Sequence, residues 1–172
     1  MYADYQGRTQ ADCRESFPLP WVLAENALHL STWVLAGWLV WPLGWRGWPL
    51  ATMAWAVVVV LVQVWLKKHN CSGCYYYGKT CHLGWGRLSA LLFEPDSGSL
   101  KTGMRLSFFY ILSPPVFLLA GVLEAVFLDL GIRHWILLGV YVALNAVAFW
   151  VRLKGCRACA LRSVCKGSAV SG

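Results

Sequence analysis

Four long apolar runs limit this chain more than any other feature of its sequence. They cover residues 21–43, 48–66, 107–128 and 134–151, and the second begins at 48 or 49. A helix of that length crosses a hydrocarbon layer about 30 Å thick. With 58% hydrophobic and 13% charged residues, the chain lacks the polar surface that a water-soluble globule needs. We therefore predict an all-α integral membrane protein, a bundle of four membrane-spanning helices.

The distribution of positive charge predicts how such a bundle is oriented. Of the fifteen Lys and Arg residues, all but Arg46 and Arg133 lie before the first run, between the second and third, or after the fourth. Because basic loops stay on the cytoplasmic side, we predict a multi-pass protein of the cytoplasmic (inner or plasma) membrane with both termini in the cytoplasm. The same bias explains the net charge of +7, so no nucleic-acid partner is expected.

A repeated motif divides the chain into two similar halves. Trp65 precedes Cys71 by six residues, Trp150 precedes Cys156 by six, and each of these cysteines begins a CxxC pair. We predict two tandem two-helix repeats, each followed by a cysteine-rich cytoplasmic segment and related by an axis along the membrane normal. The predicted segments are an N-terminal tail (1–20), the first hairpin with its cysteine motif (21–82), an amphipathic interfacial connector (83–106), the second hairpin with its motif (107–165) and a C-terminal tail (166–172).

The connector carries the pattern of a short surface helix. Trp85, Leu88, Leu91 and Leu92 recur at roughly helical spacing. A short helix with one apolar face lies flat in the headgroup region of a bilayer. We therefore predict an amphipathic helix on the inner membrane surface.

Six of the seven cysteines form two clusters near the inner ends of the second and fourth spans. In a reducing compartment, CxxC indicates a metal site or a reactive dithiol more often than a structural disulfide. Two thiolates at this spacing can occupy two corners of a tetrahedron around zinc, and the same spacing suits an iron–sulfur cluster. The sequence therefore predicts bound zinc or an iron–sulfur cluster, with these candidate ligands: Cys71, Cys74, Cys81, Cys156, Cys159 and Cys165.

Three thiolates in each half leave one ligand missing from a closed four-ligand site. His69 and His82 flank the first cluster, and either imidazole can complete it. Alternatively, the two halves share one site of four to six thiolates, or a subset of the thiolates holds a cluster. The duplication favours the shared site, whose metal-binding energy would contribute to folding.

Three ionisable residues lie inside the predicted spans, where charge is costly and commonly functional. Glu25 and His29 are four residues apart in the first span, and Glu124 is in the third. We expect these groups to pair, to line a proton path or to contact a partner subunit, with headgroup level as the simplest position for Glu25. His29 is also a candidate ligand for haem or quinone. Pro114 and Pro115 should kink the third span and open space for lipid, quinone or a neighbouring helix.

The leading functional expectation is an accessory, anchor or electron-transfer subunit of a membrane complex, in contact with lipid and with partner subunits. Length, span number and the CxxC pairs resemble the disulfide-bond-forming membrane proteins of the DsbB type in layout only. That resemblance implies a quinone-coupled thiol–disulfide oxidoreductase; its members work with exoplasmic cysteines, and no residue is carried over. A heavy-metal transporter is the second alternative, in which paired cysteines pass a soft ion to a pore.

Overall fold

The computed structural model describes residues 14–44 and 48–159. Every named element within these residues is a helix. An isolated backbone bridge also pairs Arg14 with Cys159. The prediction of an all-helical chain is therefore confirmed for this part of the molecule. The elements are α1 (Leu19–Leu39), α2 (Leu50–Leu66), the π-helical turn η2 (Lys67–Cys71), α3 (Trp85–Leu92), α4 (Leu100–Phe127) and α5 (Gly131–Arg157).

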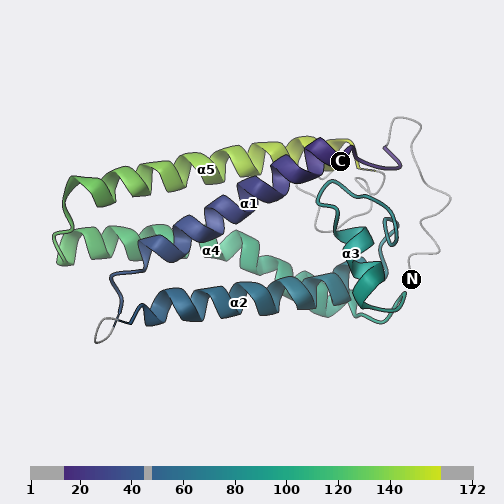
Figure 1. Ribbon diagram of the computed structural model, residues 1–172, viewed down its shortest axis with the longest axis horizontal. Helices are drawn as coiled ribbons and strands as arrows, with labels where there is room; N and C mark the ends of the chain where they lie inside the picture. The colour runs from purple at the N-terminus through teal and green to yellow at the C-terminus, as the bar shows by residue number, and fades with distance from the viewer. Residues whose placement is uncertain (1–13, 45–47, 160–172) are drawn as a thin grey trace.

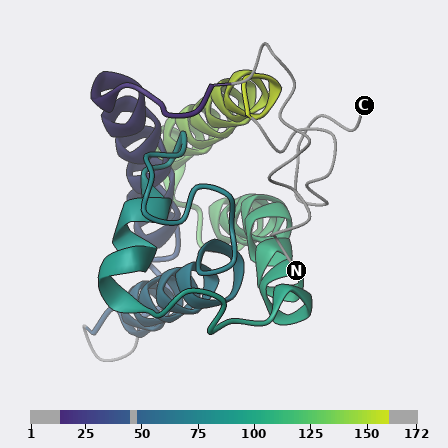
Figure 2. The ribbon, with the colours of Figure 1, turned by 90° about the vertical axis from the view of Figure 1, so that its right-hand side faces the viewer.

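The four long helices lie side by side and alternate in direction (Figure 1). Helix α1 packs most extensively against α5 and also contacts α2 and α4, while α4 contacts α2 and α5. Helices α2 and α5 stand on opposite sides without contact between their described residues. Figure 2 views the same helices from the end that carries α3.

Three helical segments are long and apolar enough to cross a membrane: Leu50–Cys71, Leu100–Phe127 and Gly131–Arg157. Few of their residues are buried inside the protein, and large apolar side chains cover their outward faces. Such exposed surfaces are suited to lipid rather than to water. Helix α1 is 21 residues long but is not among the three, because polar residues near its middle lower its hydropathy. The four-span prediction is therefore supported for three helices.

The helices extend further than the apolar runs. Helix α4 begins at Leu100, well before the predicted start at 107, and α5 continues to Arg157, beyond the predicted end at 151. Lys and Arg are good helix formers, so basic residues at these ends continue the helix instead of ending it. The predicted connector thus contains α3, a turn and the first turns of α4. Its predicted surface helix corresponds to Trp85–Leu92.

Two groups of buried apolar side chains hold the helices together. At the end where α4 joins α5, Ala36 and Leu39 of α1 meet a cluster that includes Leu138 of α5. At the opposite end, three buried side chains form what we call the aromatic cluster: Phe17, Val22 and Tyr76. The aromatic cluster lies where α1 begins, α5 ends and the segment after η2 folds back (Figure 1).

Candidate functional site

Both cysteine motifs begin where a long helix ends, at the same end of the bundle. Cys71 is the last residue of η2, and Cys156 lies in the last turn of α5. The thiols of Cys74 and Cys81 lie close enough to Cys71 to influence it electrostatically. The three cysteines of the first motif therefore lie in the same part of the fold.

The second motif meets the first at the aromatic cluster. Cys74 and Cys81 from the first motif and Cys159 from the second all pack against this cluster. The chain before α1 ties the two motifs together, because the Arg14 amide donates to the Ala158 carbonyl at 3.0 Å. Two motifs that are far apart in the sequence thus share one neighbourhood.

A fully buried carboxylate, Glu25, connects three segments at this end. Its side chain is 0% exposed and accepts hydrogen bonds from Trp21 Nε1 at 3.0 Å and from His82 Nδ1 at 2.9 and 3.0 Å. The His82 ring lies directly against Gly155, where an added Cβ would be 3.1 Å from ring atoms. Glu25 therefore links α1, the loop after Cys81 and the end of α5, and it does not pair with His29.

The two histidines proposed as ligands differ in their partners. His82 donates from Nδ1 to the Glu25 carboxylate, so in a neutral ring Nε2 carries the lone pair. Histidines that ligate metals usually donate their other N–H to a carboxylate or carbonyl in this way. His69 instead accepts a hydrogen bond on Nδ1 from the Ser99 amide at 2.9 Å, just before α4 begins. His82 therefore has the hydrogen-bond pattern expected of a ligating histidine, and His69 supports the start of α4.

The described cysteines do not form a closed ligand set as they stand. Within residues 14–44 and 48–159, no three His, Cys, Asp or Glu side chains are grouped so as to hold a metal ion. No disulfide joins any two of the five described cysteines. Cys165 lies outside the described residues. The metal site thus stays a prediction, and what the structure shows is the convergence of its candidate ligands.

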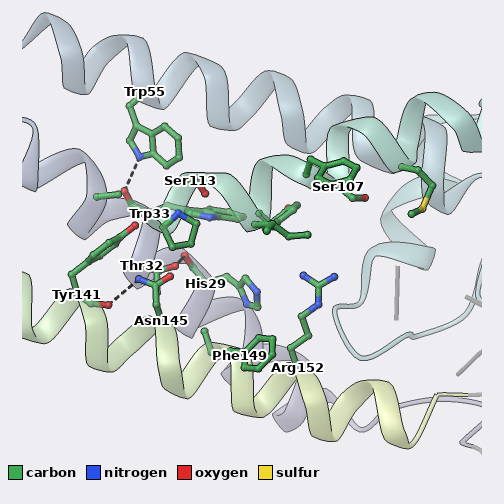
Figure 3. A pocket seen from close by; sticks show the side chains of 17 residues that line it. His29, Thr32, Trp33, Trp55, Ser107, Ser113, Tyr141, Asn145, Phe149 and Arg152 are labelled. Atoms are coloured by element: carbon green, nitrogen blue, oxygen red, sulfur yellow. Dashed lines mark hydrogen bonds between the residues drawn. The ribbon is translucent and has the colours of Figure 1, made fainter. Parts of the chain in front are cut away.

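A cavity of about 520 Å³ between the four long helices is the second notable site (Figure 3). Its volume falls in the range of small-molecule pockets. His29 and Arg152 contribute polar groups to it, and Trp55 and Tyr141 contribute aromatic rings. Pro114 also lines it, so one residue of the proline pair that predicted open space borders this cavity.

The polar groups of the cavity come from different helices. His29 donates from Nδ1 to the Glu25 carbonyl of its own helix at 2.8 Å, which leaves Nε2 as the acceptor of the neutral ring. The Arg152 guanidinium carbon lies 6.0 Å from the centre of the Tyr110 ring. Figure 3 shows the His29 ring and the Arg152 guanidinium extending into the space from α1 and α5. No Asp or Glu is among the described residues that line it.

Tyr110 connects the cavity with the cysteine-bearing end. Its ring lines the cavity, its hydroxyl accepts a hydrogen bond from Gln63, and it lies within electrostatic range of Cys71. The sequence analysis identified His29 but missed Tyr110 and Arg152. Arg152 directly follows the fourth apolar run, and the sequence analysis used it only as one of the basic residues that predict orientation.

Glu124 is separate from both sites. Its side chain is buried, and neither carboxyl oxygen has a hydrogen-bond partner among the described residues. It lies near the end of α4 that joins α5, and it does not line the cavity. The three ionisable residues that were predicted to lie inside the spans, Glu25, His29 and Glu124, therefore have three different environments.

A comparison of this chain with known protein families, with curated proteins and with solved structures finds no significant match. The geometry described above is therefore the basis for a functional argument.

Proposed function

We propose that this protein is a multi-pass membrane protein whose cysteine-bearing end holds zinc or an iron–sulfur cluster. In this proposal it serves as an accessory, anchor or electron-transfer subunit of a membrane complex. One observation carries the proposal: the two cysteine motifs converge on the aromatic cluster, beside a histidine whose N–H is held by a buried carboxylate. A subunit role fits the connections at the far end of the bundle, 40–49 and 128–130, which are too short for a domain.

The proposed ligands combine sulfur and nitrogen donors. Zinc takes thiolate and imidazole ligands in tetrahedral sites, whereas iron–sulfur clusters take mainly thiolates. A bound ion would draw these side chains together, so part of its binding energy would stabilise the fold. Lys67 favours the thiolate form of Cys71, but burial of Cys71 opposes it more strongly, so the metal itself would have to displace the thiol proton. The proposed set is Cys71, Cys74, Cys81, His82, Cys156, Cys159 and Cys165.

We also propose that α1 is the fourth span. Its polar groups are engaged with the protein: Glu25 is buried, and Asn26 donates to the carbonyls of Val22 and Leu83 at 2.7 and 2.9 Å. Polar residues in spans usually face the bundle interior in this way. The positive-inside rule then supports a cytoplasmic location for the cysteines. Labelling of Cys71 or Cys156 by a membrane-impermeant thiol reagent added from outside would contradict this orientation.

The test of the metal proposal is elemental analysis together with a visible spectrum. The full chain is purified in mild detergent without chelator or oxidant. Stoichiometric zinc in a colourless sample, or iron with absorbance at about 400 nm, would support the proposal and identify the metal. Absence of metal, with thiols that cycle to disulfides, would refute it and favour the thiol–disulfide oxidoreductase.

Three variants test which side chains the metal depends on. The double change Cys71→Ser/Cys156→Ser, one in each motif, should remove the metal. His69→Asn is the matched control and should retain it, because His69 Nδ1 is already used by Ser99. Glu25→Gln should weaken the affinity for the metal about 10- to 100-fold, as expected for a carboxylate that orients a ligating histidine. Equal metal content in all three variants would show that the metal binds elsewhere.

A further inference from the structure

The cavity between the long helices lies where two of them have separated. Helices α4 and α5 touch near their connection: His134 Nε2 lies 3.0 Å from the Gly121 carbonyl oxygen, and an added Cβ at Gly121 would meet Leu138. From there the two helices diverge toward the cysteine-bearing end (Figures 1 and 2). The residues of α4 and α5 that line the cavity fall within 104–114 and 141–152, in the half where the helices stand apart.

Among the described residues, the cavity opens to the outside between α4 and α5. Phe108 and Ile111 of α4 and Phe149 of α5 line it, yet they are 56%, 66% and 59% exposed. Lining residues from α1 and α2 are instead buried or half-buried. The three exposed side chains therefore form the rim of the opening. Because α4 and α5 are both long and apolar enough to span a membrane, this rim faces the hydrocarbon of the bilayer.

The polar side chains along the cavity wall have most of their donors in use. Thr32, Ser107 and Asn145 donate to carbonyl oxygens of their own helices at 2.7, 2.9 and 2.8 Å. Trp55 Nε1 donates to a carbonyl oxygen of α1 at 2.9 Å. Arg152 also interacts within the protein. A ligand that needs several hydrogen bonds therefore gains little here, whereas an apolar one contacts aromatic and aliphatic side chains on all sides.

The volume of the cavity separates two apolar occupants, a partner helix and a hydrocarbon chain. A helix about 10–12 Å across that rises about 5.4 Å per turn fills roughly 420–610 Å³ in each turn. The cavity of about 520 Å³ would hold a single turn, which is too little for a helix to pack. A flexible chain needs no fixed shape. It restores the dispersion contacts that the cavity walls would forfeit if the space were empty.

We infer that one acyl chain of a membrane phospholipid enters this cavity between α4 and α5. The lipid belongs to the leaflet on the cysteine-bearing side, because the cavity lies in that half of the two helices. Its chain passes the rim and lies among the aromatic side chains of the wall. The inference concerns lipid binding inside the bundle and does not depend on the metal proposal.

The test uses phosphatidylcholine that carries a photoreactive diazirine in one acyl chain. The full chain is reconstituted into vesicles of phosphatidylcholine and phosphatidylglycerol with a trace of this probe, illuminated, digested and mapped by mass spectrometry. Surrounding lipid labels outward residues such as Val57 and Ile136, which are exposed. Tyr141 is 3% exposed and lines the cavity, so a label on Tyr141 requires a chain inside it.

Two filling variants and one control define the outcome. Ala148→Leu adds bulk to the α5 wall and Ser113→Leu to the α4 wall; Ser113 lies across the space from α5 in Figure 3. Each should reduce labelling of Tyr141 at least about fivefold, because the added side chain takes the space of the lipid chain. Ala143→Leu is the matched control, the same change at an exposed α5 residue that does not line the cavity, and should leave this labelling unchanged. If Ala148→Leu fails to fold, Ser113→Leu keeps the test decisive.

A label on Tyr141 that is lost in the filling variants and kept in the control would support the inference. Label confined to outward residues, and equal in all four chains, would overturn it, because lipid would then only surround the bundle. A label on Tyr141 that persists in the folded filling variants would also overturn it. Native mass spectrometry of the purified chain identifies the retained molecule: a phospholipid mass supports the inference, and a free fatty acid or a quinone in its place overturns it.

Discussion

Replacing Glu25 by Gln tests the contact that joins the ends of α1 and α5. In the native chain the carboxylate accepts from two donors, Trp21 Nε1 and His82 Nδ1, with no exposure to solvent. Glutamine has nearly the same shape but offers one acceptor oxygen and one NH₂ group. An amide oxygen in the position of Oε2 stays within 3.0 Å of both donors, but the NH₂ group then takes the position of Oε1 and faces the His82 N–H.

The expected cost follows from these two donors. A hydrogen bond to a charged group contributes about 1.5–3 kcal/mol, and a buried donor left without a partner costs about 1–3 kcal/mol. Because the amide still accepts one bond, we expect Glu25→Gln to lower the free energy of unfolding by about 2–4 kcal/mol. Most of this lost stability should come from the contact with His82, because His82 makes two of the three hydrogen-bond contacts to the carboxylate.

The measurement is unfolding of the purified chain in mixed micelles of increasing denaturing-detergent fraction, followed by circular dichroism. Glu124→Gln is the matched control: another buried carboxyl in a long helix, without a hydrogen-bond partner among the described residues, so that this change removes no hydrogen bond and should cost less than Glu25→Gln. A double-mutant cycle with His82→Gln should give a coupling energy above about 1 kcal/mol. Equal effects of the two Glu→Gln changes, or a coupling near zero, would refute the argument.

Further predictions concern close backbone contacts and a helix–helix bond. Gly86→Ala should destabilise the protein by about 3 kcal/mol or more, because an added Cβ would lie 1.9 Å from the Tyr76 carbonyl oxygen; its control, Gly139→Ala, has no atom within 4 Å and should stabilise the helix by about 0.5–1 kcal/mol. A similar melting point for the two variants would contradict this. Thr52→Val should cost about 1 kcal/mol, since Thr52 Oγ1 donates to the Gly37 carbonyl at 2.7 Å and ties α2 to α1; an unchanged unfolding midpoint would count against that contact.

The positions of the helices followed from sequence because each long helix carries an apolar run that only a helix can place in a membrane. Their ends did not follow. Lys101 and Arg105 were assigned to the connector because charge was taken to end a span, yet both continue α4. The π-helical turn Lys67–Cys71 had no sequence signal at all, since its hydrogen bonds depend on local packing.

The candidate site followed from sequence only in part. Cysteine spacing identified the two motifs, and the repeat predicted that they would come together. The pairing of Glu25 with His82 spans 57 residues. Glu25 had been singled out as an ionisable residue in a predicted span, and His82 as a candidate metal ligand. No local pattern encodes such a contact, because it depends on how α1 packs against the end of α5.

The packing of α1 against α5 also has a consequence for the time course of synthesis. The helix made first has its most extensive contacts with the helix made last. At about 5–20 residues per second, the roughly 120 residues between the ends of these helices take on the order of 10 s to appear. During that interval His82 is made, but the Gly155 surface of α5 against which its ring packs is still missing. A nascent chain stopped before α5 should therefore hold α1 loosely, and such a truncated chain is the form most exposed to proteolysis or to capture by an insertion chaperone.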